Sequence, residues 1–149
     1  MKVFIQNEAG SFIKHIHDEK SLTPNRTTVV SRSYLFPYGF VLDTTAAGLN
    51  VDCFVLTNQS LRTGEIIDCV PIALMEQIED TQEDHNVLAV IPGEPVHLDA
   101  QIQQTLSDFV THVFDHIPGK KIRPGKFLNR GAALAYLRAH QDSPVADTE

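Results

Sequence analysis

The hydrophobic pattern of this chain changes its period in the last third of the 149 residues, and that change constrains the fold more than any other feature. Before it, short apolar or β-branched runs alternate with Gly, Pro and Asn, which is typical of strands joined by turns. The runs cover residues 2–6, 12–16, 27–31, 52–57, 65–73 and 87–91. Several short strands that precede any helix predict a small barrel or a coiled sheet.

The last third has the period of a helix. Apolar residues recur three or four positions apart over residues 102–117, which predicts one amphipathic helix ending at Pro118-Gly119. A second helix is expected over residues 130–140, with Asn129 as its N-cap. The predicted fold class is therefore α+β, a β-barrel with two C-terminal helices packed outside it. We expect a single domain over residues 1–142 and a polar, frayed tail over residues 143–149.

Composition excludes several classes of protein. Twelve Lys and Arg against 19 Asp and Glu give a net charge of −7, which argues against a nucleic-acid partner. Cys53 and Cys69 are too few for a disulfide scaffold, and both lie in apolar runs that predict burial. No apolar run approaches the roughly 20 residues of a membrane span, and the N-terminus lacks a signal-peptide core. We therefore expect a cytoplasmic protein with no membrane partner.

Carboxylates gather in one segment of the chain. Five of them fall within nine residues: Glu76, Glu79, Asp80, Glu83 and Asp84. They form either a solvated acidic turn between two strands or part of a cation site, because clustered like charges repel unless they are neutralised. Asp52 begins an apolar run, where a carboxylate is partly buried and is usually paired or bound to metal. If Asp52 meets the acidic segment, their oxygens suit Mg²⁺ or Mn²⁺.

A second group of residues has the chemistry of a phosphate site. Arg26, Tyr34 and Tyr38 offer a guanidinium and two phenols, which donate well to phosphate oxygens. The two tyrosines are also explained, more simply, as core aromatics beside Pro37, and Lys14 as an exposed strand residue. The residues alone leave these alternatives open.

Taken in order, these features resemble the soluble family I inorganic pyrophosphatases over roughly residues 3–137. The segments that carry the resemblance are GSFIK, YLFPYGF, LNVDCFVL, LRTGEIIDCVPIAL and EDTQEDHNVLAV. The resemblance implies a five-stranded OB-like barrel that hydrolyses inorganic pyrophosphate or a related phosphoanhydride with divalent ions, normally Mg²⁺. It also implies a homo-oligomer, a hexamer or a dimer.

Carried over residue by residue, the resemblance gives roles to seven side chains. Lys14 and Arg26 match phosphate-binding cations, and Tyr34 and Tyr38 match active-site tyrosines. The three metal-binding positions are matched by Asp52, Glu79 and Asp84, with Glu79 one methylene longer than the aspartate of the family.

Several positions depart from the family pattern. Ala47 and Leu49 stand where the first two aspartates of the DGDPxD motif belong. Other site positions are changed as well: Gln6 and Ile16 replace glutamates, Asn86 replaces a phosphate-binding lysine, and Ile117-Pro118 replaces a Tyr-Lys pair. Compensation by Asp43, Lys120, Lys121 or Arg123 is possible on sequence grounds.

Three hypotheses follow from this mixture of kept and lost residues. The first is a divergent Mg²⁺-dependent pyrophosphatase, weakened because a lost preorganised group costs about 10²–10³ in kcat. The second is a non-catalytic homologue that serves as a phosphate-binding, metal-binding or assembly module. The third, an OB-like nucleic-acid module, is the weakest because the chain is acidic and lacks a basic aromatic stripe.

Overall fold

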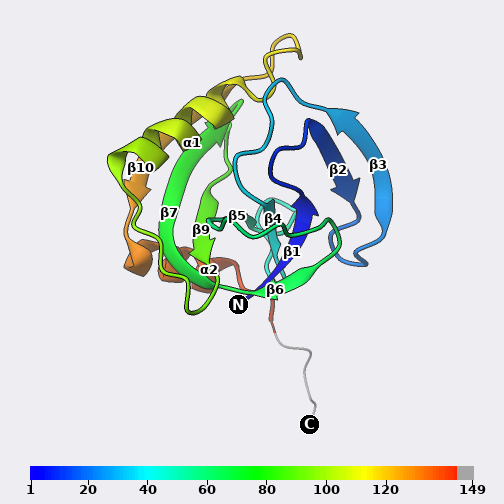
Figure 1. Ribbon diagram of the computed structural model, residues 1–149. Coiled ribbons are helices and arrows are strands. Elements are labelled where there is room, and N and C mark those ends of the chain that lie inside the picture. The colour runs from blue at the N-terminus through cyan, green and yellow to red at the C-terminus, as the bar shows by residue number, and fades with distance from the viewer. Residues whose placement is uncertain (144–149) are drawn as a thin grey trace.

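One long sheet and a separate hairpin make up the β-structure, and two helices cover the sheet (Figure 1). The computed structural model describes residues 1–143. Its strands are β1 Lys2–Asn7, β2 Ile13–His17, β3 Pro24–Val29, β4 Tyr38–Val41, β5 Asp52–Val55, β6 Ile66–Asp68, β7 Val70–Glu79, β8 Gln82–Glu83, β9 Asn86–Val90 and β10 Ile122–Leu128. The helices are α1 Ala100–His112 and α2 Arg130–His140.

The strand order in the main sheet is β10-β7-β9-β5-β4-β1-β6, with β8 paired to β7. Strands β2 and β3 pair only with each other and form the hairpin seen at the right of Figure 1. At the centre, β5 runs parallel to β9, whereas β4 and β7 are antiparallel to their neighbours. The central strands are almost completely buried, as their continuous apolar runs predict.

Two apolar clusters fill the two sides of this sheet. Phe54 and Leu88 belong to the cluster covered by α1, whereas their chain neighbours Cys53 and Val87 belong to the other, which includes Ala133 of α2. Successive residues of a strand point to opposite faces, so each central strand contributes to both clusters. Both cysteines are buried, as the sequence predicted, and both are free thiols.

The helices confirm one prediction and correct another. Helix α2 has the predicted bounds, and the Asn129 side chain accepts a hydrogen bond from the Ala132 amide at 3.0 Å. Helix α1 begins earlier than predicted, because Asp99 caps it, and it ends at His112. The periodicity to Ile117 was misleading: Val113 is still buried, but the chain beyond it forms turns, and Ile117 is exposed.

The α+β class and the two outer helices are confirmed, but the strand assignments need four corrections. Strand β4 was not predicted, because its aromatic residues follow Pro37. Residues 65–73 form parts of two strands, which are separated at Cys69. Strand β10 lies between the helices, so the predicted order of strands first and helices last was wrong. The acidic segment is also mainly strand, since β7 continues to Glu79.

The single domain over residues 1–142 stays a prediction, and the predicted tail lies outside the described residues from 144 onward. In the part of the chain that the structure describes, neither helix is long and apolar enough to cross a bilayer.

Gly39 controls how closely β4 approaches β1. It pairs with Ile5, and a Cβ atom added at Gly39 would lie 1.7 Å from the carbonyl oxygen of Phe4. No side chain fits there without separating the two strands. Since Tyr38 precedes this glycine, the close approach also fixes where that tyrosine lies.

We predict that Gly39→Ala lowers the free energy of unfolding by about 3–5 kcal/mol, because the methyl group overlaps backbone atoms that cannot move independently. Gly93→Ala is the matched control: Gly93 has φ +84° and open space around it. The Gly93→Ala variant should lose only about 1 kcal/mol of unfolding free energy, because alanine is strained at this positive φ. Urea unfolding followed by circular dichroism measures both, and equal losses would contradict the steric explanation.

Candidate active site

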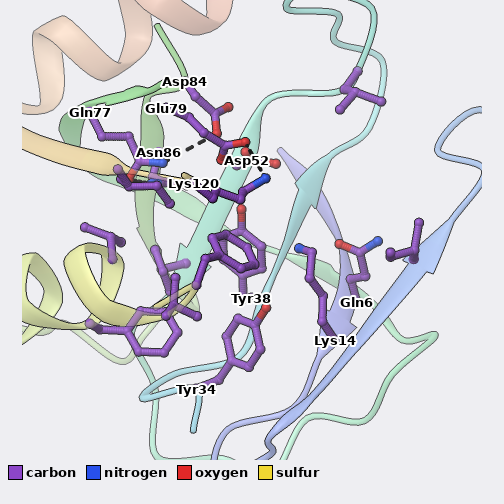
Figure 2. A pocket seen from close by; sticks show the side chains of 18 of the residues that line it. Gln6, Lys14, Tyr34, Tyr38, Asp52, Gln77, Glu79, Asp84, Asn86 and Lys120 are labelled. Carbon is purple, nitrogen blue, oxygen red and sulfur yellow. Dashed lines mark hydrogen bonds and ion pairs between the residues drawn. The ribbon is translucent and has the colours of Figure 1, made fainter. Parts of the chain in front are cut away.

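A cavity of about 260 Å³ opens at the end of the α1-side core, between the β2–β3 hairpin and the sheet (Figure 2). Six of the seven side chains predicted to form the site line it: Lys14, Tyr34, Tyr38, Asp52, Glu79 and Asp84. They come from β2, β4, β5, β7 and the connections beside them. Residues 70 positions apart in sequence therefore face one cavity.

Arg26 is the exception. It is exposed on β3 and is not among the residues that line the cavity. Its cross-strand partner in the hairpin is Ile16, which does line the cavity. Arg26 thus lies beside the wall of the site without forming part of it.

The alternation of β5 explains why Asp52 reaches the cavity. Asp52 and Phe54 are two residues apart and share one face of the sheet, the face of the α1-side core. Phe54 is buried in that core, and Asp52 stands where the core gives way to the cavity. Asp52 is also paired with Asn86 across the parallel β5–β9 ladder, and Asp84 lies two residues before this first residue of β9.

Asp52 and Asp84 form a pair of like charges. The pKa of the Asp52 carboxyl is raised well above its usual value, first by burial and then by the negative charge of Asp84 and a hydrogen bond between the two carboxyls. Lys14 opposes this rise. Two adjacent carboxylates are stable together only if they share a proton or a cation neutralises them.

Lys14 faces these carboxylates from the hairpin. Burial lowers the pKa of its ammonium group, and the negative charges of Asp52, Glu79 and Glu19 oppose that effect. The ammonium lies 5.6 Å from the ring centre of Tyr38 and 5.8 Å from that of Phe114. Glu19, which follows β2, also lines the cavity. It was not predicted, because no local pattern indicates that this turn folds back onto the site.

The two tyrosines serve the core and the cavity together. Their rings stack with centres 5.6 Å apart, and Tyr34 also packs on Phe109 at 5.2 Å. Burial and the nearby Asp52 raise the pKa of both hydroxyls above the usual value. Both phenols are therefore neutral at physiological pH and act as O–H donors. The two tyrosines are thus core aromatics and cavity-lining hydroxyls at once, which are the two interpretations that the sequence left open.

Two buried amides support Asp84. The Asn86 amide nitrogen donates to the Gln77 side-chain oxygen at 2.9 Å, and the Gln77 amide nitrogen lies 3.4 Å from an oxygen of Asp84. Both amide residues are at least 95% buried. Among the described residues, the Asn86 side-chain oxygen has no hydrogen-bond partner. Gln77 was not identified from the sequence, since only its pairing partners bring it to the site.

Glu79 is engaged by a lysine. Lys120 Nζ lies 3.1 Å from Glu79 Oε2, and the same ammonium lies 4.7 Å from the ring centre of Phe114. Of the residues considered as compensating groups, Lys120 lines the cavity, whereas Asp43, Lys121 and Arg123 are absent from its lining.

Most of the departures from the family pattern also lie in the cavity wall. Gln6, Ile16, Leu49 and Asn86 line it, so the positions with changed chemistry are site positions. Ala47 does not line it. Two of these four residues, Ile16 and Leu49, are apolar. The family pattern has carboxylates at both positions, so these parts of the wall have lost their charge.

The donor set offers a pair of carboxylates to a hard divalent cation. In residues 1–143, no three His, Cys, Asp or Glu side chains are grouped as a metal-binding cluster. Asp52 and Asp84 nevertheless form a carboxylate pair whose repulsion a cation would relieve. Mg²⁺ is often held by one or two carboxylates together with water and substrate phosphates. The pair therefore fits such an ion at a site completed by phosphate oxygens.

Known proteins of one family resemble this chain in sequence. The profile of the inorganic pyrophosphatase family matches residues 4–130. The inorganic pyrophosphatase of Saccharolobus solfataricus is 28% identical over 137 residues, which cover 86% of this chain and 78% of that protein. The corresponding protein of Aquifex pyrophilus is 29% identical over 136 residues, covering 85% and 75%.

Solved structures give the same result for the fold. The inorganic pyrophosphatase structure from Coxiella burnetii superimposes with a TM-score of 0.84 and 25% identity, covering 94% of this chain and 92% of that one. The OB-like fold expected from the resemblance is thereby confirmed. Since the family profile spans most of the sequence, the chain belongs to the inorganic pyrophosphatase family.

Proposed function

We propose that this protein hydrolyses inorganic pyrophosphate, or a closely related phosphoanhydride, with one divalent cation. The observation that carries the proposal is the Asp52–Asp84 carboxylate pair, which shares one cavity with Lys14 and two neutral tyrosine hydroxyls. Family membership supports the same chemistry.

In this proposal the residues of the chain bind and orient the substrate. The Lys14 ammonium binds a phosphate oxygen, and the incoming negative charge favours the charged form that burial disfavours. Tyr38 and Tyr34 donate their O–H groups to the same phosphate, since phenols are protonated at physiological pH and burial raises their pKa further. Tyr38 is the better placed, since Tyr34 is only 3% exposed.

The cation is assigned to Asp52 and Asp84. Family members generally use divalent metals, and we propose Mg²⁺, or Mn²⁺, at this pair. A divalent ion bound there would neutralise phosphate oxygens and favour deprotonation of the attacking water. Gln77 and Asn86 hold Asp84 in place for that role.

We propose that turnover is slow compared with members that retain the full set of carboxylates. Loss of one preorganised electrostatic group costs about 10²–10³ in kcat, and such losses are not additive. Gln6, Ile16 and Leu49 all lie in the cavity wall where those groups would act.

The alternative is a homologue that binds phosphate and metal without turnover. It is favoured by one observation, the lack of a three-ligand metal cluster within residues 1–143. The two functions differ in whether phosphate is released from pyrophosphate.

We also propose that copies of the chain assemble in the cytoplasm. Phe12, Ile13 and Val29 are apolar, and each is about half exposed, at 55%, 46% and 60%. Ile13 and Val29 are cross-strand partners, so they share one face of the β2–β3 hairpin. An exposed apolar face of this kind supports self-association.

With Mg²⁺ present, we expect the wild-type protein to release phosphate from pyrophosphate, and EDTA to abolish the release. Lys14→Ala should lower kcat/KM about 10²-fold, because it removes a charged donor inside the cavity. Lys2→Ala is the matched control, since Lys2 is exposed and paired with Asp68. If the wild-type protein releases phosphate no faster than the Lys14→Ala variant, the proposed hydrolysis is wrong and the non-catalytic alternative holds.

Without metal, we expect Asp52→Asn to stabilise the protein at pH 8 by on the order of 1 kcal/mol. The folded-state pKa of Asp52 is raised, so its contribution to stability is complete at low pH and is lost as pH rises through that pKa. The gap between variant and wild type should therefore widen from pH 5 to pH 8, as measured by urea unfolding in EDTA.

Asp68→Asn provides the control of opposite sign. Lys2 lowers the pKa of the exposed Asp68 carboxyl, so removing that charge should lower stability slightly at pH 8. Parallel pH profiles for Asp52→Asn and wild type would refute the like-charge explanation for Asp52.

Leu49→Asp should raise Mg²⁺ affinity about tenfold, because it adds a carboxylate to a cavity wall that already holds the carboxylate pair. Ala47→Asp serves as its control: Ala47 is exposed, lies outside the lining and has φ +53°, a conformation that Asp tolerates. Isothermal titration with Mg²⁺ measures both variants. A larger gain from Ala47→Asp would contradict this placement of the site.

A further inference from the structure

We infer that Lys120 is a substrate-binding cation and that Glu79 is an internal competitor, which holds Lys120 until a phosphate takes its place. This differs from the metal-ligand role that the resemblance implies for Glu79. The inference rests on the proposed function, because it concerns the same cavity and the same anionic substrate.

The first support is the geometry of the ion pair. Glu79 and Lys120 are 3.1 Å apart, and their side chains are 30% and 29% exposed. Figure 2 shows the pair within the cavity, near Asp52 and Tyr38. A partly exposed ion pair contributes little stability, and a phosphate group carries more negative charge than the single carboxylate it would replace. An anion that enters the cavity can therefore displace Glu79 from Lys120.

The second support is the position of Phe114. Its ring centre lies 4.7 Å from Lys120 Nζ and 5.8 Å from Lys14 Nζ. One aromatic ring thus contacts both ammonium groups that line the cavity. Cations are attracted to the face of such a ring, which helps to hold two like charges near one another. Two nearby ammonium groups suit a ligand with two phosphoryl groups.

The third support is the backbone that delivers Lys120. Gly119 has φ +80°, which ends the turn after α1, and β10 then pairs with β7 so that Ile122 lies opposite Glu79. The next residue, Lys121, is bound through its backbone to Asp80 and has an exposed side chain outside the cavity lining. Adjacent lysines therefore differ in whether they face the cavity.

The fourth support is the charge of the lining. Within the described residues, four carboxylates and two lysines line the cavity: Glu19, Asp52, Glu79 and Asp84, with Lys14 and Lys120. Asp52 and Asp84 contact each other, whereas Glu79 contacts Lys120. Glu79 is thus already neutralised by a cation of the chain, and the remaining pair is left for the divalent ion.

The test is isothermal titration with inorganic phosphate in the presence of Mg²⁺. Lys120→Gln should weaken phosphate binding about tenfold, as expected for loss of a charged donor. Lys121→Gln should leave it unchanged. Both variants replace one of two adjacent lysines by glutamine and remove one positive charge. A difference between their phosphate affinities therefore reports the position of Lys120 in the cavity and not a general loss of positive charge.

The effect of Glu79→Gln on phosphate binding has opposite signs for the two roles of Glu79, as a competitor for Lys120 or as a metal ligand. As a competitor, Glu79→Gln should tighten phosphate binding about threefold and leave Mg²⁺ affinity unchanged. As a metal ligand, the same change should weaken Mg²⁺ binding and phosphate binding together. Glu83→Gln, on the neighbouring strand β8 and outside the lining, controls for the loss of one negative charge.

The double variant Lys120→Gln/Glu79→Gln completes the cycle. If Glu79 acts by holding Lys120, the tightening caused by Glu79→Gln should disappear once Lys120 is gone. Tightening that persists in the double variant would reduce the effect to general electrostatics and overturn the inference.

Failure of the inference and failure of the proposed function give different results. If wild type binds phosphate but Lys120→Gln matches Lys121→Gln, the inference alone is wrong. If wild type does not bind phosphate at all, the proposed function is wrong and the inference falls with it.

Discussion

The parallel pairing of β5 with β9 is the interaction on which the rest of the structure depends. It places Asp52 opposite Asn86 and brings Asp84, just before β9, next to the same strand end. The same two strands supply buried side chains to the clusters on both faces of the sheet. A register shift of one residue would turn Asp52 toward the other face and separate the carboxylate pair.

Charge is the second constraint, and it explains why the site is built as it is. Four carboxylates around a small cavity are unfavourable unless each is neutralised. The chain meets part of this need with Lys14 near Asp52, Lys120 at Glu79 and the Gln77 amide at Asp84. The backbone amide of Asn50 donates to Glu19. Asp52 and Asp84 still lie side by side as like charges, and under the proposed function a divalent cation relieves their repulsion.

Much of the fold was predictable from local patterns. Helix α2 has both its periodicity and its N-cap in the sequence, and β1, β5 and β9 are apolar runs bounded by polar or turn residues. Strands β4 and β10 were not predicted, because Pro and Gly interrupt both regions and their pairing depends on distant strands. Helix α1 was extended too far, since Val113 and Phe114 continue the apolar spacing after the helix has ended.

The sequence by itself determined the family and six of the residues around the cavity, because the types of residue and their order along the chain carry that information. Tertiary structure decided the rest. The hairpin leaves Arg26 exposed beside the cavity, and the pairing of β10 with β7 brings Lys120 to Glu79, 41 positions away. Such contacts depend on strand register and on the length of the turn after α1, which are set by packing of the whole sheet and not by any local pattern.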